Sequence, residues 1–402
     1  MSVSSPVVVP HVDAAALKRR VHDRLVRVGV DVDDGSAHGE LRRRLSDLLR
    51  HEAPLLGAAR HDEMVEELVR DVAGLGPLEP LLADPDVDEI MLNGPGRAFV
   101  ERAGRIEPIT VPLDADGILR VVARVIAPLG LRLDRASPIV DARLADGSRL
   151  HAVVPPLAID GPYVTIRRFR TRPVPLDAFG VDDNGVRLLD WMVRAGWNVV
   201  VSGGTSTGKT TLLNALSGAI PPEERVVTIE ETAELRLAQP HVVRLEARRP
   251  NAEGAGEVTV RELVRAALRM RPDRIVVGEV RGGEALDMLQ ALNTGHDGAL
   301  STVHANSPAD ALSRLETLVL FAGIGLPAAA IRAQMASAIN AVVQLDRGPD
   351  GARRVACVAE VVAGEHGVDV RSLLEGRDGG WAVQLPSRPP RRPGVDPFVE
   401  RA

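Results

Sequence analysis

The sequence is poor in cysteine, aromatic residues and long apolar runs, and each shortage narrows what the protein can be. Cys357 is the only cysteine among 402 residues, which excludes an internal disulfide and favours the cytosol. Aromatic residues make up 2% of the chain, so the core must be aliphatic and surfaces that stack on nucleic-acid bases are disfavoured. No apolar run reaches transmembrane length, so we expect no direct membrane insertion and any membrane association to pass through partners.

Charge and length are those of a soluble protein of several domains. The net charge is −6 and no long basic run marks a nucleic-acid groove, so no nucleic-acid partner is expected. A length of 402 residues suits two or three domains, at roughly 150 residues each. The apolar start, residues 1–10, lacks the positive region of a signal peptide.

The sequence of the smaller, N-terminal part of the chain predicts helices followed by a small α+β domain. Residues 1–60 are charged and weakly periodic, which indicates a flexible start followed by helices. Residues 61–170 begin with a helix that ends near Gly74 and continue as short β-like runs separated by turns, a pattern typical of an α+β domain. Residues 171–175 are expected to form a linker, because two prolines are incompatible with both a helix interior and a central strand.

The larger part, residues 176–385, alternates strand-like and helix-like segments. This alternation predicts an α/β domain with a parallel sheet covered by helices. The last residues, 386–402, combine proline with arginine, a composition typical of disorder. The clearest expected strands are 198–201, 225–229 and 274–278, and the clearest expected helices are 210–216 and 263–270.

One of only two lysines in the chain lies in a phosphate-binding loop. Of 49 lysines and arginines, only Lys18 and Lys209 are lysines. A lysine at position 209 suits a nucleotide site, because a compact ammonium reaches between β- and γ-phosphates where a guanidinium fits badly. Gly203–Thr210 fits the pattern G-x-x-x-x-G-K-[ST], between a β-branched strand and a helix. Such a loop cradles phosphate with backbone N–H groups, and Thr210 is placed to bind Mg²⁺. The candidate ATP-binding residues are Gly203, Gly204, Thr205, Ser206, Thr207, Gly208, Lys209, Thr210 and Thr211.

Acidic residues follow two of the expected strands. Glu279 comes directly after the run 274–278, at the carboxyl end of a strand, where ligands of open α/β sheets bind. There it can hold the shell of a Mg²⁺ ion or polarise water. Glu230 and Glu231 follow the run 225–229, and one of them can activate the attacking water. The same spacing is equally typical of a solvated acidic turn.

Two histidines and four arginines are weaker candidates. His296 and His304 match no zinc pattern, and a hydrogen-bonded structural role is the simpler interpretation of their spacing. Arginines outside the nucleotide domain can act as fingers on a phosphate, in cis or from a neighbouring subunit. The candidates are Arg143 and Arg149, which flank an Asp-Gly turn, and Arg167 and Arg168, which precede the linker.

The ordered set of motifs resembles the type II/type IV secretion ATPases and, more narrowly, the CpaF-like ATPases of tight-adherence (Tad/Flp) pilus assembly. The resemblance covers roughly residues 62–345 and is more specific than the phosphate loop alone. It is carried by the loop itself and by Thr228–Leu235, Leu268–Asp273, Gly278–Ala285, Thr294–His296, His304–Asn306, Gly74–Leu78, Asn93–Gly94 and Ile166–Phe169.

The resemblance implies a RecA-like P-loop NTPase domain joined to a smaller N-terminal, PAS-like α+β domain with a helical extension. It implies a homo-hexameric ring with ATP and Mg²⁺ between subunits. Within the site it implies that Glu230 is the general base and Glu279 the second-strand acid, and that His296 and His304 form a histidine box that senses the γ-phosphate. It also implies that Arg143, Arg149, Arg167 and Arg168 are candidate finger or clasp residues.

The chain departs from the family pattern in three places. Glu231 stands where aspartate is usual, and its extra methylene can reposition a water of the metal shell. Ser206 stands where the loop usually has glycine, and serine tolerates positive φ poorly. A four-cysteine zinc insert, present in some general-secretion relatives, is impossible with one cysteine, which favours the pilus-assembly or type IV branch.

We therefore expect a Mg²⁺-dependent ATPase that powers a pilus or secretion machine. Its expected location is cytoplasmic, peripheral at the inner face of the cytoplasmic membrane, through polytopic platform proteins. The alternatives are an ATPase of a type IV secretion or conjugation channel, a nucleic-acid motor of RecA type, and a nucleotide-gated switch that binds ATP without useful turnover.

Overall fold

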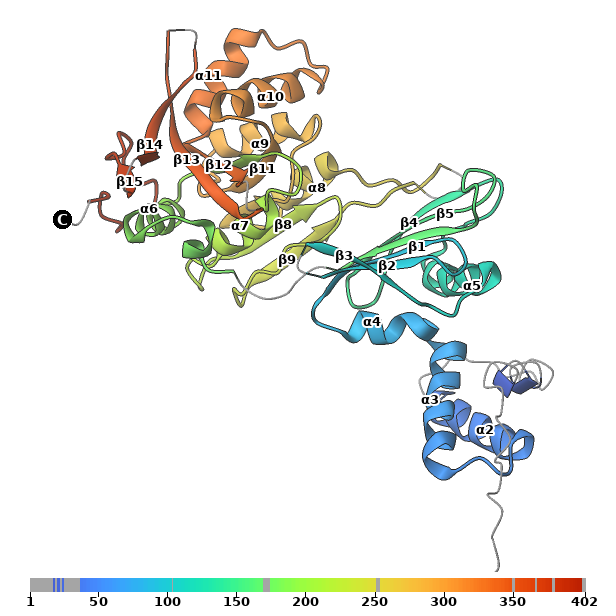
Figure 1. Cartoon of the computed structure of the whole chain (residues 1–402). Coiled ribbons are helices and arrows are strands. Elements are labelled where there is room, and N and C mark those ends of the chain that lie inside the picture. Colours follow the sequence, from blue (N-terminus) through green and yellow to red (C-terminus); the bar gives the residue numbers. More distant parts are fainter. Residues whose placement is uncertain are drawn as a thin grey trace, which may run out of the picture. The chain divides into compact units, whose positions relative to one another are not determined.

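The chain folds into two compact units, residues 1–170 and 171–402 (Figure 1). The structure is a computed structural model that describes residues 17–18, 20–21, 24, 37–102, 104–168, 174–250, 254–348, 351–365, 367–377 and 380–399. Of the expected linker, 171–175, only Val174 and Pro175 belong to these ranges, and they lead into the short helix η3 (Leu176–Phe179). No helix in the described ranges is long and apolar enough to cross a membrane.

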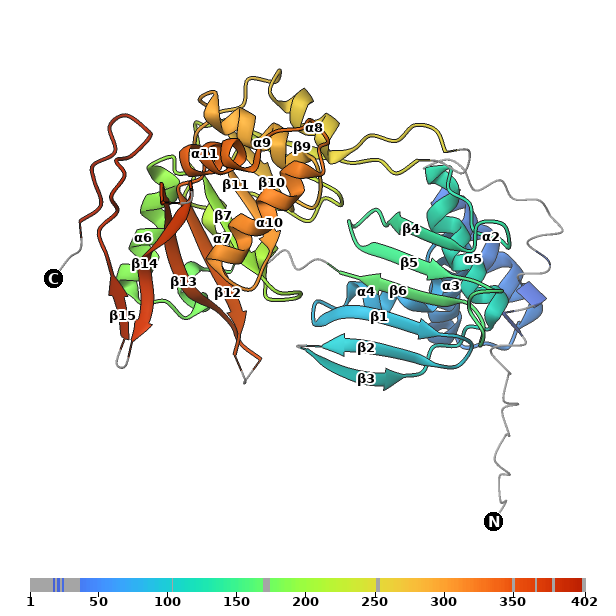
Figure 2. The same ribbon diagram turned by 90° about the horizontal axis from the view of Figure 1, so that it is seen from above.

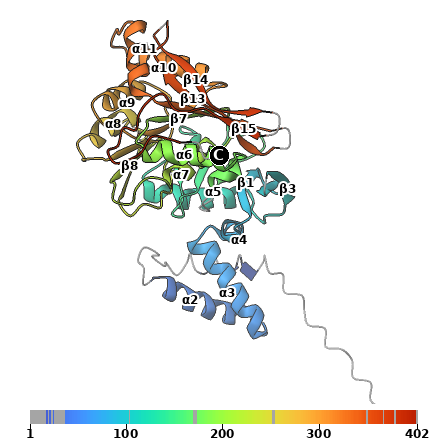
Figure 3. The ribbon, with the colours of Figure 1, turned by 90° about the vertical axis from the view of Figure 1, so that its left-hand side faces the viewer.

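The first unit begins with two helices that have a core of their own. The helices α2 (Ala37–Glu52) and α3 (Ala58–Ala73) lie side by side (Figure 3). Buried leucines of α2 belong to one apolar cluster with Met64 and Leu68 of α3. The expected boundary between residues 60 and 61 therefore falls inside this helical pair, because the apolar face of α3 packs on α2.

A six-stranded antiparallel sheet forms the rest of the first unit. Its strand order is β3-β2-β1-β6-β5-β4, and helix α5 covers one face (Figure 2). Ile118 and Val122 of α5 are buried with Ile90 and Ile166 of the sheet, so this domain has the expected α+β character. The elements are η1 (Gly76–Leu78), α4 (Glu79–Ala83), β1 (Val87–Asn93), β2 (Ala98–Arg102), β3 (Arg105–Ile109), α5 (Ala115–Ile126), η2 (Ala127–Leu129), β4 (Ile139–Arg143), β5 (Arg149–Val153) and β6 (Tyr163–Arg167).

A nine-stranded sheet organises the second unit. Its order is β15-β14-β13-β12-β7-β11-β10-β8-β9. The six strands from β12 to β9 are parallel, whereas β13, β14 and β15 extend the sheet with antiparallel pairs. The strands are β7 (Val199–Gly203), β8 (Val226–Glu230), β9 (Val242–Glu246), β10 (Arg274–Val277), β11 (Leu300–His304), β12 (Ala341–Arg347), β13 (Arg353–Val362), β14 (Asp369–Arg377) and β15 (Gly380–Val383).

Helices cover both faces of this sheet, as the alternating sequence predicts. Val199 and Val201 of β7 point into the core that contains α6 and α7, while Val200 points into the core that contains α8 to α11. Burial on both faces explains why the parallel strands are continuous β-branched runs. The helices are α6 (Asp183–Arg194), α7 (Lys209–Ser217), α8 (Val260–Ala267), α9 (Glu284–Asn293), α10 (Pro308–Leu320) and α11 (Ala328–Ala338).

The C-terminal segment is bound to the second unit along its described length. The indole N–H of Trp197 donates to the carbonyl of Pro389 (3.2 Å) and that of Trp191 to the carbonyl of Asp396 (2.9 Å). Phe398 is buried and its ring centroid lies 5.7 Å from that of Trp191. The prediction of disorder for 386–402 is therefore wrong for residues 386–399, because the fold supplies partners that composition alone does not reveal.

Candidate active site

The phosphate loop connects the end of β7 to the start of α7. Gly208, with φ +94°, is the residue before the helix, and Lys209 is its first residue. Ser206 also has positive φ, +60°, and Arg271 is the other non-glycine residue of this kind in the described ranges. The serine thus takes the conformation that its usual glycine would take, at the steric cost expected from the sequence.

Lys209 lies inside the loop that it follows. Its side chain is buried, and its Nζ donates to the carbonyls of Gly203 (3.0 Å) and Gly204 (2.7 Å). Burial lowers the pKa of Lys209 and Arg281 acts in the same direction, whereas the charge of Glu279 opposes them. The ammonium is therefore held at the loop by carbonyl groups and faces a carboxylate at the end of β10.

His304 joins the phosphate loop to Glu279. The Nδ1 of His304 lies 3.1 Å from Oε1 of Glu279, and its Nε2 lies 3.0 Å from Oγ1 of Thr205. Because an ionised carboxylate only accepts hydrogen bonds, Nδ1 carries the proton in this contact, and Nε2 is left to contact the Thr205 hydroxyl. The histidine is thereby oriented between the loop and the strand-end carboxylate.

Glu279 is kept ionised by its neighbours. Burial raises the pKa of this carboxyl, but hydrogen bonds from Arg281 and His304 outweigh burial, and the net pKa is lowered. The Nη2 of Arg281 lies 2.7 Å from Oε2 of Glu279, and its Nη1 lies 3.2 Å from Oε2 of Glu231. Glu231 is thus paired with Arg281 and, at a longer distance of 3.6 Å, with Arg249.

Glu230 is the buried last residue of β8, at the same end of the sheet as the phosphate loop. Its Oε1 accepts from the backbone N–H groups of Glu234 (2.8 Å) and Leu235 (2.9 Å). Its Oε2 is buried and has no hydrogen-bond partner within the described ranges. Burial raises the pKa of Glu230 to about 7, although the two N–H groups act in the opposite direction. A carboxyl with a pKa near neutrality and one unpaired oxygen is suited to accept a proton from water.

The oxygen donors at this edge fit a Mg²⁺ ion that arrives with a nucleotide. Thr210 follows Lys209 in α7, and Glu279 supplies an ionised carboxylate. No group of three or more His, Cys, Asp or Glu residues able to hold a metal occurs in the described part of the chain. Mg²⁺ keeps several waters and takes phosphate oxygens, so a hydroxyl with one carboxylate suits it better than a full protein cage would.

His296 does not join this site within one subunit. It precedes β11, whereas His304 ends that strand, so the whole strand separates them. Its Nδ1 lies 3.3 Å from the carbonyl of Ala291 in α9. His304 therefore lies at the phosphate loop, whereas the strand places His296 at the opposite end of the sheet. That both histidines sense a γ-phosphate stays a prediction.

The four candidate arginines belong to the first unit, and three of them form a row. Arg143, Arg149 and Arg167 are direct cross-strand neighbours on β4, β5 and β6. Direct neighbours share a face, and here it is the face turned away from α5, since the adjacent Leu150 and Ile166 point into the core. Arg149 is also paired with Asp141 (3.2 Å).

Arg168 has a structural role instead. Its guanidinium donates to the backbone carbonyls of Asp84 and Val87, the latter at 3.0 Å, and so ties the end of β6 to the start of β1. Because Nη1 of Arg168 is used inside its own domain, a structural role accounts for this arginine, and its role as a finger stays a prediction. Arg281 is a further residue of the site, which spacing in the sequence does not single out. Its only signal in the sequence is a cation two residues after the carboxylate that follows a strand.

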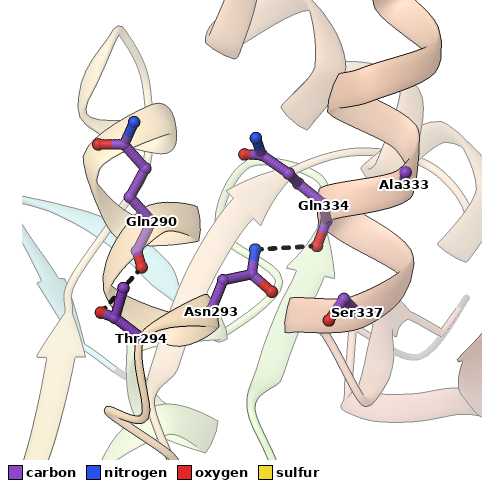
Figure 4. Close-up of a pocket in the computed structure, with 6 residues that line it drawn as sticks. All are labelled: Gln290, Asn293, Thr294, Ala333, Gln334 and Ser337. Carbon is purple, nitrogen blue, oxygen red and sulfur yellow. Dashed lines mark hydrogen bonds between the residues drawn. The ribbon is translucent and has the colours of Figure 1, made fainter.

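A groove elsewhere on the second unit is separate from this site. It lies between α9 and α11, where Nδ2 of Asn293 donates to the carbonyl of Gln334 at 3.3 Å (Figure 4). Both helices end there, before the first residues of β11 and β12. The groove therefore lies at the sheet edge opposite the phosphate loop. Its lining residues are Gln290, Asn293, Thr294, Ala333, Gln334 and Ser337.

Known proteins are similar in sequence to most of this chain. A sequence model of the family described as type II/IV secretion system protein matches residues 71–372. A Mycobacterium tuberculosis protein provisionally named for conjugal transfer is 42% identical over 303 residues, which are 73% of this chain and 86% of that protein. The type IV secretion system protein PtlH of Bordetella pertussis is 40% identical over 319 residues, 70% of this chain and 91% of PtlH.

A solved structure supports the fold. The X-ray structure of the Legionella pneumophila ATPase DotB matches with a TM-score of 0.52 at 21% identity, over 72% of this chain and 80% of that one. The family match spans most of the chain and includes the phosphate loop, Glu230, Glu279 and His304. The chain therefore belongs to the type II/IV secretion system ATPase family, in which a smaller N-terminal domain is followed along the chain by a RecA-like P-loop ATPase domain.

Proposed function

We propose that this ATPase hydrolyses Mg²⁺-bound ATP between the subunits of a homo-hexameric ring and uses the energy to drive a pilus or secretion machine. The observation that carries the proposal is the meeting of Lys209, His304 and Glu279 at one sheet edge, with the buried Glu230 on the next strand. These groups combine phosphate binding, an ionised carboxylate and a proton acceptor, which are the parts that phosphoanhydride hydrolysis needs.

Each residue has a distinct role in this mechanism. Backbone N–H groups of the phosphate loop and the start of α7 hold the phosphates, and Lys209 neutralises charge on the β- and γ-oxygens. Thr210 and Glu279 would hold Mg²⁺, Glu279 partly through water, and the ion's charge would supply electrostatic stabilisation of the phosphates. Glu230 accepts a proton from the attacking water at its unpaired Oε2. His304 orients Glu279 and contacts the loop at Thr205.

The ring is proposed because the candidate finger arginines lie outside the ATPase domain. Arg143, Arg149 and Arg167 present three cations along one row of the first unit's sheet. Such a row can complete the charge stabilisation of a nucleotide held by a neighbouring subunit. His296, at the far edge of its own sheet, would act on a nucleotide only across such an interface.

Two machines remain candidates for the work that hydrolysis drives. The CpaF-like motif order favours assembly of a Tad/Flp pilus, through polytopic platform proteins at the inner face of the cytoplasmic membrane. The names of the relatives, conjugal transfer protein and PtlH, favour a type IV secretion or conjugation channel. Deleting the gene separates them: loss of surface pili supports the first, and loss of transfer with intact pili supports the second.

The hydrolytic assignment is tested by steady-state phosphate release. Lys209→Ala is expected to abolish turnover, and Glu230→Gln to retain ATP binding but lose hydrolysis. Wild-type turnover in either variant would reject these roles. Wild-type protein that binds ATP without releasing phosphate would instead support a nucleotide-gated switch, and strong stimulation by DNA would support a nucleic-acid motor.

A further inference from the structure

A hairpin formed by β12 and β13 runs alongside the phosphate loop. β12 is parallel to β7 and its Leu345 is the register partner of Gly203, the last residue of β7. β12 continues for two more residues, and β13 returns antiparallel beside it (Figure 2). The end of β12 and the start of β13 therefore lie at the same end of the sheet as the phosphate loop.

Arg353, the first residue of β13, lies against the loop. Its Cδ is 2.7 Å and its Nε 3.6 Å from the position that a Cβ on Gly208 would occupy. The positive φ favours glycine at 208, and a Cβ there would also displace the stem of Arg353. Arg353 is an exposed residue, and its stem lies beside the residue that precedes Lys209.

A second arginine stands opposite the first. Arg347 and Arg353 are direct register partners across the hairpin. The Nε of Arg347 donates to the carbonyl of Gly351 (3.1 Å). The end of β12 and the start of β13 therefore bring two arginines to the side of the phosphate loop.

The strand order indicates which part of a bound nucleotide would lie beside Arg347 and Arg353. Glu230 is the last residue of β8, His304 is the last residue of β11, and Glu279 follows β10. These three strands lie on one side of β7, whereas β12 lies on the other side. The terminal phosphate belongs on the side of the hydrolytic groups. The hairpin therefore faces the opposite end of the triphosphate chain.

We propose that Arg353 binds the α-phosphate of the nucleotide, with Arg347 adding to the positive potential at that position. This inference rests on the proposed nucleotide site and deepens it. An α-phosphate contact is common to ATP and ADP and does not change during hydrolysis, so Arg353 contributes to nucleotide affinity and not to the chemical step.

Calorimetric titration with ADP tests this directly. Arg353→Ala is expected to weaken ADP binding about tenfold, and to raise the KM for ATP by a similar factor with kcat within about twofold of wild type. Arg353→Lys should recover part of the affinity, and Arg353→Glu should lose more than Arg353→Ala. Arg354→Ala is the matched control, because the stem of Arg354 lies against Gly180 and not against the loop.

Three results would overturn the inference. These are unchanged ADP affinity in Arg353→Ala, a loss confined to ATP, or an equal loss in Arg354→Ala. The proposed function fails separately: a wild-type protein that binds ADP but releases no phosphate from ATP contradicts hydrolysis and leaves the ADP comparison intact. A wild-type protein that binds neither nucleotide overturns both.

Discussion

His304 and Glu279 are hydrogen-bonded across neighbouring strands, with 3.1 Å between Nδ1 and Oε1. The other ring nitrogen contacts Thr205 of the phosphate loop, so one imidazole fixes the distance between the loop and the carboxylate. A group placed in this way contributes to the transition state more than to nucleotide binding.

We therefore expect His304→Ala to lower kcat about 100-fold with little change in ADP affinity. His296→Ala is the paired comparison, because its ring lies at the other edge of the sheet against Ala291. It should lose far less activity when measured by phosphate release in the same buffer. Equal losses in the two variants would show that both histidines act on the nucleotide, as the family resemblance implies.

The pH dependence of turnover should report Glu230. Its pKa is raised to about 7 by burial, and it must be ionised to accept a proton. We expect kcat/KM to fall about tenfold per pH unit below that value and to level off above it. Glu231→Gln should keep the same midpoint, because Glu231 is exposed and paired with Arg281. A midpoint that follows the Glu231 substitution would contradict the assignment of the base.

The same carboxyl should link folding stability to pH. Its pKa is about 7 in the folded protein against an ordinary 4.5, so the folded state binds the proton more tightly. This contribution to stability is fully present below about pH 4.5 and is lost as the pH rises through 7. The shift corresponds to a free energy on the order of 3 kcal/mol.

Glu230→Gln keeps the side chain neutral at every pH, so it isolates this effect. Relative to wild type, the variant should gain stability between pH 5 and pH 8 in denaturant unfolding. Contributions from other groups cancel in this difference. A difference that stays constant across that range would mean that the folded carboxyl titrates near its ordinary pKa.

Gly278 should be intolerant of alanine because Glu230 occupies the space beside it. A Cβ at Gly278 would lie 2.8 Å from Cγ of Glu230, closer than real Cβ contacts allow. Gly278→Ala should displace the Glu230 side chain and reduce kcat by at least about tenfold while ADP still binds. Gly376→Ala is the control within the same unit, since its nearest neighbour would be 3.9 Å away. Unchanged kcat in Gly278→Ala would show that Glu230 needs no fixed position.

The parts of the site that the sequence predicts are those defined by local pattern. The phosphate loop and the carboxylates after 225–229 and 274–278 each depend on one strand and the residues next to it. Parallel strands bring their carboxyl ends to one edge, so this clustering also follows from the fold class. The expected helix at 263–270 is shifted to Val260–Ala267, with Thr259 as its N-cap.

The parts that the sequence does not predict depend on strand register and on distant partners. Arg167 and Arg168 are adjacent, yet Arg167 continues a row of arginines while Arg168 binds carbonyls of a distant turn. Spacing does not separate these outcomes, because each depends on which strand lies beside β6. The contact between Arg353 and Gly208 likewise joins residues that lie far apart in the chain.

The C-terminal segment supplies a last prediction, on stability. Glu360 has no exposed surface and accepts hydrogen bonds from the backbone of Ser387 (3.1 Å) and Arg388 (3.0 Å). Further along, Arg391 pairs with Asp297 in the loop before β11. The C-terminal segment, which is rich in proline and arginine, is thus bound by two carboxylates of the second unit, those of Glu360 and Asp297.

Removing residues 386–402 should therefore destabilise the second unit and shift tryptophan emission to the red, because Trp191 and Trp197 lose their cover. The finer test is a double-mutant cycle with Arg391→Ala and Asp297→Ala in denaturant unfolding. These side chains are 23% and 25% exposed. We expect a coupling free energy of about 1 kcal/mol, since the pair is only partly screened by water. Strictly additive effects would mean that the segment is held by its backbone and tryptophan contacts alone.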